Sequence, residues 1–289
     1  MVDKVDKTMT VDEIVGQIKD GDTIAIGGWG PVRKPMAILR AIAKSKLKNL
    51  TFLSAGGLEM DMMLGAGKVK KMVFPFMSLE GAPGAMGNYM RMRKEGILDI
   101  SEVSEHMFFC GFKAASERLP FYPTRSGAFT DLLKINPHIK TIEAPYTGET
   151  LVAMPPFKVD VALLHVNAAT RSGYGRIAGD EVIDPLITRA TINNGGKVFM
   201  QAERIVTVEE LKCNPYNIEI INIYVTGVVE TPYGAHPGKI YPEYDWDERH
   251  LAEYGKASAD AETFKAYLDK YTKVPNHEAY LKLVGKNLA

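Results

Sequence analysis

Cysteine is scarce in this chain, whose 289 residues include only Cys110 and Cys213. Two cysteines so far apart in sequence exclude a disulfide framework and a cysteine-rich metal site. The six histidines do not stand at metal-ligand spacings, and the sequence contains no His-Glu-x-x-His motif. We therefore expect no metal, and we interpret both cysteines as reduced thiols in a cytoplasmic setting.

An excess of charge of either sign is also absent. Thirty-five basic and thirty-five acidic residues cancel, so the chain has no net field that would attract nucleic acid or a membrane surface. No apolar run approaches the roughly 20 residues that cross a bilayer. The charged segment 1–7 lacks the apolar core of a secretory signal. The sequence predicts a soluble, cytoplasmic protein with neither a nucleic-acid nor a membrane partner.

Two glycine-rich segments lack the residues that would bind a nucleotide. In the first, Gly28-x-Gly30 is followed by Arg33 where a dinucleotide fingerprint has its third glycine. In the second, Gly65-Ala-Gly67-Lys68 lacks both the first glycine and the hydroxyl residue of a P-loop. No serine stands in the context of a nucleophile elbow. These patterns argue against dinucleotide binding, NTP hydrolysis and a serine hydrolase.

Strand and helix patterns alternate along most of the chain. The first helix has Thr10 as its cap and Glu13 to complete a capping box, and Gly21 is expected to end it. Further strands are predicted at 22–26, 50–54, 69–76, 159–166, 197–200 and 218–229, and helices at 35–45, 58–65, 86–95, 104–118, 182–193 and 207–212. This alternation predicts an α/β fold with an open, largely parallel sheet flanked by helices.

The chain is predicted to form a single domain over 1–289, with a core of about 8–240. Segment 121–157 is rich in Pro, Gly and Thr, and we interpret it as loops and short strands rather than a domain boundary. From about 245 to 289, apolar residues at helical spacing predict a helical extension that packs on the sheet or on a partner.

The glycine turn over 27–30 is the first candidate for a binding site. It follows a predicted strand and precedes a predicted helix, which is where α/β proteins bind ligands. Its glycines allow the backbone to approach an acyl group closely, and Arg33 and Lys34 could hold a carboxylate or a phosphate. The alternative is a plain strand-to-helix turn with solvated charges.

Glu105 is the second candidate, in the first turn of the helix predicted over 104–118. As a structural residue it would stabilise the helix start. As a nucleophile or general base it would require partial burial beside Met107 and Phe108, with Arg125 as an orienting cation. The residues alone do not decide between the two roles.

Several segments together resemble the α subunits of family I CoA-transferases of the glutaconate type. They are 21–35, 101–121, 159–165 and 232–238. The resemblance implies the CoA-transferase fold, a partner β subunit in an αβ or (αβ)2 assembly, and a coenzyme A thioester as substrate with no bound cofactor. In these transferases a glutamate of the β subunit carries the covalent intermediates. By analogy this chain supplies one wall of the acyl pocket, with substrate-binding residues Gly27, Gly28, Trp29, Arg33, Lys34, Ser78 and Arg125.

The resemblance leaves two chemistries open. The main hypothesis is a transferase that moves CoA between carboxylic acids, with a dicarboxylic or keto acid expected. The alternative is a CoA-dependent hydrolase that opens a carbon ring, as in steroid catabolism, with Glu105 as the catalytic residue. The glutaconate-type pattern has glutamine at that position, whereas Glu105, Trp29, Cys110-Gly111 and Arg125 are similar to the ring-opening branch. A noncatalytic accessory subunit is the third possibility.

Overall fold

A parallel sheet forms the centre of the computed structural model, which describes residues 5–79, 86–179, 183–213 and 218–286. The sheet has nine strands, and its parallel part runs in the order β12 (Gly227–Glu230), β10 (Lys197–Ile205), β8 (Val161–Ala169), β1 (Thr23–Ile26), β2 (Leu50–Leu53), β3 (Val69–Phe74) and β4 (Asp99–Glu102). Two short strands, β9 (Gly175–Arg176) and β11 (Ile218–Ile220), extend it antiparallel beside the end of β8. The predicted open, largely parallel sheet is confirmed.

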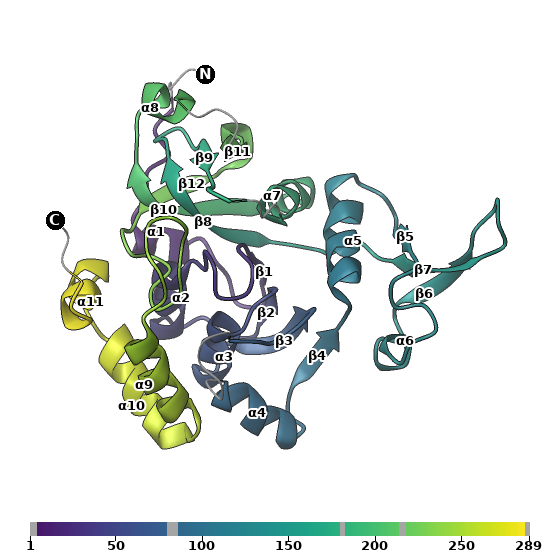
Figure 1. The fold of residues 1–289 in the computed structure, drawn as a ribbon, viewed down its shortest axis with the longest axis horizontal. Helices are drawn as coiled ribbons and strands as arrows, with labels where there is room; N and C mark the ends of the chain where they lie inside the picture. The colour runs from purple at the N-terminus through teal and green to yellow at the C-terminus, as the bar shows by residue number, and fades with distance from the viewer. Residues whose placement is uncertain (1–4, 80–85, 180–182, 214–217, 287–289) are drawn as a thin grey trace.

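Helices cover both faces of this sheet (Figure 1). One face packs against α2 (Met36–Lys44), α3 (Leu58–Gly65) and the C-terminal helices, and the other against α5 (Glu105–Ser116) and α7 (Ile183–Asn193). Strand β1 supplies both cores, because Ile24 and Ile26 face the first and Ala25 the second. Strand β8 is buried at every position, as expected for a central parallel strand that is covered on both sides.

Helix α1 (Val11–Val15) has the predicted capping box between Thr10 and Glu13. It ends at Gly16, and the prediction that it continues to Gly21 is wrong. Gln17 and Ile18 donate their N–H groups to the carbonyls three residues back, so the chain tightens into a turn and still buries Ile18. Helices α4 (Gly87–Lys94) and α8 (Val208–Lys212) lie where they were predicted.

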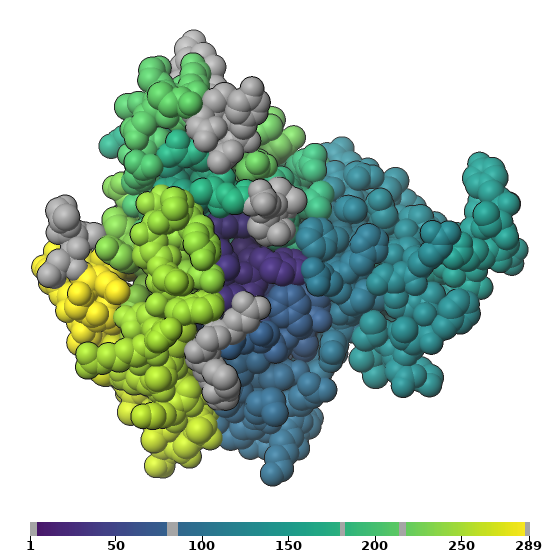
Figure 2. All heavy atoms as spheres, in the orientation of Figure 1, coloured from purple at the N-terminus to yellow at the C-terminus, as the bar shows by residue number. Residues whose placement is uncertain are grey.

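Residues 122–154 form an arm that stands away from the main sheet as a separate lobe (Figures 1 and 2). It contains an antiparallel sheet of β5 (Tyr122–Thr124), β7 (Thr150–Met154) and β6 (Lys140–Glu143), with α6 (Leu132–Ile135) between β5 and β6. The interpretation of 121–157 as loops and short strands is confirmed. The single strand predicted over 218–229 is wrong, because a 3-10 turn at Asn222–Tyr224 divides it into β11 and β12.

The chain ends in α9 (Glu248–Ser258), α10 (Ala261–Thr272) and α11 (His277–Leu283). These helices form the predicted extension, and they pack on α2 and α3 of the same chain through buried aromatic side chains such as Tyr254, Phe264 and Tyr280. Among the residues that the structure describes, no helix is both long and apolar enough to cross a membrane.

Candidate active site

The carboxyl ends of four neighbouring strands bring most of the predicted site residues to one edge of the sheet. Gly27 follows β1, Ser54 follows β2, Ser78 lies beyond β3, and Glu105 lies beyond β4. The strand order reverses between β1 and β8, because the chain continues to β2, β3 and β4 on one side and to β10 and β12 on the other. Open α/β sheets bind ligands outside the carboxyl ends of their strands at such a reversal.

The turn after β1 requires glycine at its first two positions. A Cβ atom on Gly27 would collide with the carboxylate of Asp184, and one on Gly28 with the carbonyl oxygen of Val32. Gly28 also has a φ of 74°, in the left-handed region that favours glycine. Its N–H donates to Asp184 Oδ1 at 3.2 Å, and its carbonyl accepts from Lys34 Nζ at 3.1 Å.

Arg33 and Lys34 lie inside the protein, each only 2% exposed. The expectation of solvated charges is wrong, and neither cation is free to hold a ligand anion in this chain. Arg33 Nη2 pairs with Asp184 Oδ2 at 3.2 Å, and Lys34 Nζ lies 3.4 Å from Glu59 Oε1. Lys34 also donates to Ser54 Oγ at 3.1 Å. Both cations therefore support the glycine turn from underneath.

The four buried charges balance as two cations and two carboxylates. Burial lowers the pKa of Lys34, and the negative charges of Glu59 and Asp184 act in the opposite direction. Glu59 and Asp184 are both fully buried, and the sequence analysis did not identify either of them. Their signal was present, since Glu59 interrupts an otherwise apolar helix and Asp184 stands in the first turn of α7.

Trp29 joins three elements in an aromatic cluster at the same edge. Its ring centroid lies 5.4 Å from that of Phe76, which follows β3, and 5.5 Å from that of Phe109 in α5. Phe109 is one helical turn after Glu105, so both side chains lie on the same side of α5. Trp29, Phe76 and Phe109 therefore form an apolar surface that continues from the glycine turn toward Glu105.

Glu105 is the first residue of α5, and it is exposed in this chain. The expected partial burial beside Met107 and Phe108 is absent, because those two side chains face the core and are 0% and 1% exposed. The helix cap is Ser104, whose Oγ accepts the N–H of Met107 at 3.2 Å. The Glu105 carboxylate is therefore not needed as the cap of α5.

Arg125 does not orient Glu105 in this chain. Its guanidinium makes two hydrogen bonds to the Glu149 carboxylate, at 2.6 and 2.7 Å, and its side chain is 79% exposed. The arm nevertheless reaches the start of α5, because Ser126 Oγ lies 2.7 Å from Ser104 Oγ. A cavity of about 340 Å³ opens there, lined by His106, Leu151 and residues 123–126.

Ser78 lies beside the loop after β2. Its backbone N–H donates to the carbonyl of Gly56 at 3.2 Å, and a Cβ atom on Gly57 would collide with the Ser78 carbonyl oxygen. This close approach places Ser78 at the same edge as Gly27, with its side chain partly exposed. Of the eight predicted site residues, five thus reach the edge of the sheet: Gly27, Gly28, Trp29, Ser78 and Glu105.

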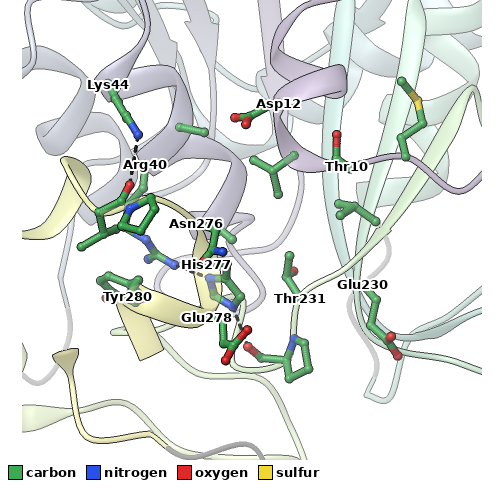
Figure 3. Close-up of a pocket in the computed structure, with 18 of the residues that line it drawn as sticks. Thr10, Asp12, Arg40, Lys44, Glu230, Thr231, Asn276, His277, Glu278 and Tyr280 are labelled. Atoms are coloured by element: carbon green, nitrogen blue, oxygen red, sulfur yellow. Dashed lines mark hydrogen bonds between the residues drawn. The ribbon is translucent and has the colours of Figure 1, made fainter. Parts of the chain in front are cut away.

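A second cavity, of about 640 Å³, lies apart from this edge (Figure 3). The N-terminal segment, α2, the end of β12 and the connection from α10 to α11 line it, and none of its lining residues belongs to the glycine turn or to α5. Arg40 crosses its wall to stack on Tyr280 and to donate hydrogen bonds to the carbonyl of His236 and to His277 Nδ1. In the described part of the chain, no group of three acidic, histidine or cysteine side chains is placed to hold a metal ion.

Comparison with known proteins gives one consistent family. A family model described as coenzyme A transferase matches residues 8–231. The IpdA subunit of the cholesterol ring-cleaving hydrolase of Rhodococcus jostii (strain RHA1) is 36% identical over 279 residues, which cover 94% of this chain and 93% of that protein. One of the subunits of glutaconate CoA-transferase from Acidaminococcus fermentans is 30% identical over 298 residues, with 96% and 92% covered.

A solved structure agrees with these relatives. The crystal structure of glutaconate coenzyme A-transferase from Acidaminococcus fermentans matches with a TM-score of 0.89 and 29% identity, over 96% of this chain and 93% of that one. The resemblance inferred from the sequence is thus confirmed in both of its branches. Because the family model spans most of the chain and the relatives match it nearly from end to end, this protein belongs to the coenzyme A transferase family.

Proposed function

We propose that this chain is the α subunit of a heteromeric acyl-CoA enzyme, a CoA-transferase that moves CoA between carboxylic acids. The observation that carries the proposal is the turn at Gly27–Gly30. Its glycines bring bare backbone to the ligand-binding edge of the sheet, while the neighbouring cations are held underneath it. In this assignment Gly27, Gly28, Trp29 and Ser78 line the acyl group of a CoA thioester, and no further cofactor is required.

The β subunit supplies the rest of the site. Glu105 is exposed in the isolated chain, whereas a reacting carboxylate works best where water is excluded and electrostatic interactions are strong. A carboxylate of the partner attacks the thioester carbonyl, and the acceptor acid later receives the CoA. A dicarboxylic or keto acid is the proposed acceptor, in line with the relatives named glutaconate and 3-oxoadipate CoA-transferase. Because Arg33 and Lys34 are paired internally, the cation for a second carboxylate comes from the partner.

A transfer assay on the purified αβ complex tests this function. An acyl-CoA donor is mixed with an unrelated carboxylate, and formation of the new acyl-CoA is followed by mass spectrometry of the CoA esters. Transfer requires both acids and leaves total CoA thioester constant. Intact-mass analysis of the two chains after donor addition should locate the covalent CoA adduct on the β chain. Consumption of the thioester without a new one would reject the transferase.

Hydrolytic ring opening is the second candidate, and Glu105 favours it. A carboxylate at this position separates this chain from the glutaconate-type pattern, and the flat aromatic surface of Trp29, Phe76 and Phe109 suits a ring-containing acyl group. The ring-cleaving IpdA relative also has the higher identity, 36% against 30%. In this reaction Glu105 activates a water, and the thioester survives while a C–C bond breaks. Incorporation of ¹⁸O from labelled water into a ring-opened acyl-CoA would distinguish it from transfer.

We place the enzyme in the cytoplasm. The two cysteines support this location, because Cys110 is buried and Cys213 is exposed, and both are free thiols. Fractionation of the source cells with an antibody against the chain would test the location, and recovery outside the cytoplasmic fraction would contradict it.

A further inference from the structure

We infer that Glu59 and Asp184 are positioning residues that set the glycine turn, and with it Trp29, at the wall of the acyl pocket. They act through Lys34 and Arg33 and do not touch the substrate. The inference deepens the proposed function and rests on it in one respect, namely that this turn lines the acyl pocket. The placement of the turn by the two carboxylates can be measured without any activity.

Charged side chains hold the Gly28 peptide unit from both sides. The N–H of Gly28 donates to the Asp184 carboxylate, 3.2 Å from Oδ1 and 3.4 Å from Oδ2. The carbonyl oxygen of Gly28 accepts from the Lys34 ammonium at 3.1 Å. Hydrogen bonds to ionised groups are stronger and more directional than neutral ones. With both of its polar groups engaged in a buried environment, residue 28 has one permitted orientation.

Glu59 sets the Lys34 side of this arrangement. It reaches back from α3 to accept the Ser54 hydroxyl at 2.7 Å and the N–H of Gly57 at 3.2 Å. Lys34 Nζ lies 3.4 Å from the same carboxylate and also donates to the carbonyl of Ala55 at 2.9 Å. Lys34 thus joins the turn after β1 to the loop after β2, and Glu59 fixes where the ammonium lies.

Asp184 sets the opposite side. It belongs to α7, which follows β8 and β9 in the chain, so it holds the turn from across the reversal of strand order. Its partner Arg33 has a φ of 57°, an unfavourable backbone conformation for a residue with a side chain. Such strain persists only where the surroundings hold the residue in place. Here the Arg33 N–H donates to the carbonyl of Lys239 at 2.8 Å, and its guanidinium pairs with Asp184.

Trp29 receives the consequence, because it follows Gly28 directly. Its own backbone closes the turn with Val32 through two hydrogen bonds, of 3.1 and 2.9 Å, so the turn moves as one unit. A tilt of the Gly28 peptide would separate the indole ring from Phe76 and Phe109. Misplacement of a pocket wall by about 1 Å can cost on the order of 100-fold in rate.

The test uses the αβ enzyme with Trp246→Phe, which leaves Trp29 as the only tryptophan of this chain. In this background Glu59→Gln and Asp184→Asn retain shape and remove one charge each. We expect the Trp29 emission to shift to longer wavelength and acrylamide quenching to rise, relative to the Trp246→Phe parent complex, where any tryptophans of the β chain contribute equally. We also expect kcat to fall about 10- to 100-fold, with KM changed less than about threefold.

Asp61→Asn is the matched control. Asp61 lies on the same helix as Glu59 and is equally buried, but its carboxylate accepts hydrogen bonds from Tyr254, Asn88 and the N–H of Tyr89, away from the turn. This variant should change stability and leave both the Trp29 emission and kcat unaltered. If Glu59→Gln does not fold, Ser54→Ala removes the hydroxyl between Lys34 and Glu59, and it should shift the Trp29 emission in the same direction.

A double substitution separates positioning from stability. Lys34→Met with Glu59→Leu removes both charges of the pair, so no buried charge is left alone and much of the stability should return. The Gly28 carbonyl still loses its donor, and the Trp29 signal should stay shifted. Unchanged Trp29 emission and quenching in folded Glu59→Gln and Asp184→Asn variants would overturn the inference. If the complex proves to have neither transferase nor hydrolase activity, the fluorescence result still decides the role of the two carboxylates.

Discussion

Glu105 stands at the start of α5 without serving as its cap. Ser104 already accepts the N–H of Met107, and the Glu105 side chain is exposed at the carboxyl edge of the sheet, beside Phe109 and Trp29. The residue therefore contributes to its helix only through the favourable position of a negative charge near the N-terminus. A carboxylate with so small a structural role can be substituted without loss of the fold.

Glu105→Gln distinguishes the two proposed chemistries. If Glu105 acts as a general base, kcat of the αβ complex should fall by roughly 10² to 10⁴, because glutamine has the same shape but cannot accept a proton. The melting temperature should change little, since Ser104 remains as the cap. Steady-state rates and a thermal melt on the same preparation provide the measurement. A fully active variant would leave the transferase, with its nucleophile on the partner chain.

Arg33 and Arg125 should respond differently to the same substitution. Arg33→Met leaves the Asp184 carboxylate buried without its cation, and breaking a buried pair in this way costs about 3–5 kcal/mol of unfolding free energy. Arg125→Met removes an exposed pair with Glu149, which should leave the midpoint of urea unfolding almost unchanged. Urea denaturation of both variants measures the difference. Equal midpoints would mean that the Arg33 pair does not hold the turn.

At the level of helices and strands, the sequence predicted most of the main sheet. The apolar runs of β1 and β8 and the capping signals of α1 are local, so they can be recognised without the fold. The break between β11 and β12 was not recognised, because a 3-10 turn leaves no change in the apolar pattern. Strand β4 was missed as well, since its sequence Asp-Ile-Ser-Glu is half polar.

The candidate site was predicted less completely than the sheet, for a physical reason. The glycine turn and Glu105 have local signatures at the ends of a strand and a helix. The partners of Arg33 and Lys34 do not, since Asp184 lies 151 positions after Arg33, and only the assembled sheet brings them together. For the same reason the sequence could not show that Arg125 would pair with Glu149 in the arm.

The C-terminal helices should loosen in mild acid. Burial lowers the pKa of His236 to about 3 and those of His250 and His277 to about 4, from an ordinary value of 6.5. The unfolded chain therefore takes up protons at a higher pH than the folded one. Stability is complete above pH 6.5 and is lost as the pH falls below it, by up to about 1.4 kcal/mol per pH unit for each histidine.

Asp61 opposes this trend, because burial raises its pKa to about 6 and its contribution grows as the pH falls. Three histidines outweigh one carboxyl group, so the net effect between pH 7 and pH 5 is destabilising. Urea midpoints across this range, with His250→Asn as the comparison, test the prediction. A midpoint that rises from pH 7 to pH 5 would contradict it.

At the scale of the whole molecule, this chain resembles one part of a larger assembly. The arm exposes large apolar side chains, with Phe129 88% and Tyr146 97% exposed, and the Glu105 edge is open. We expect the chain purified alone to show no turnover of acyl-CoA, and the complex with the β subunit to be active. Size-exclusion chromatography with light scattering, beside the activity assay, tests this. A stable monomer with full activity would contradict the heteromeric function.

The reversal of strand order between β1 and β8 also determines the order in which the chain can fold during synthesis. Strands β1 to β4 are complete by residue 102, but β1 pairs with β8, and Ile24 meets Val161 only after 137 further residues (161 − 24) have been made. At roughly 5–20 residues per second, an open edge of β1 waits on the order of ten seconds. Unpaired strand edges invite association with other chains. Ribosome-bound chains arrested before β8 should therefore be cleaved by protease around β1, whereas the finished chain is protected there, and equal protection in both would show that the edge is covered earlier.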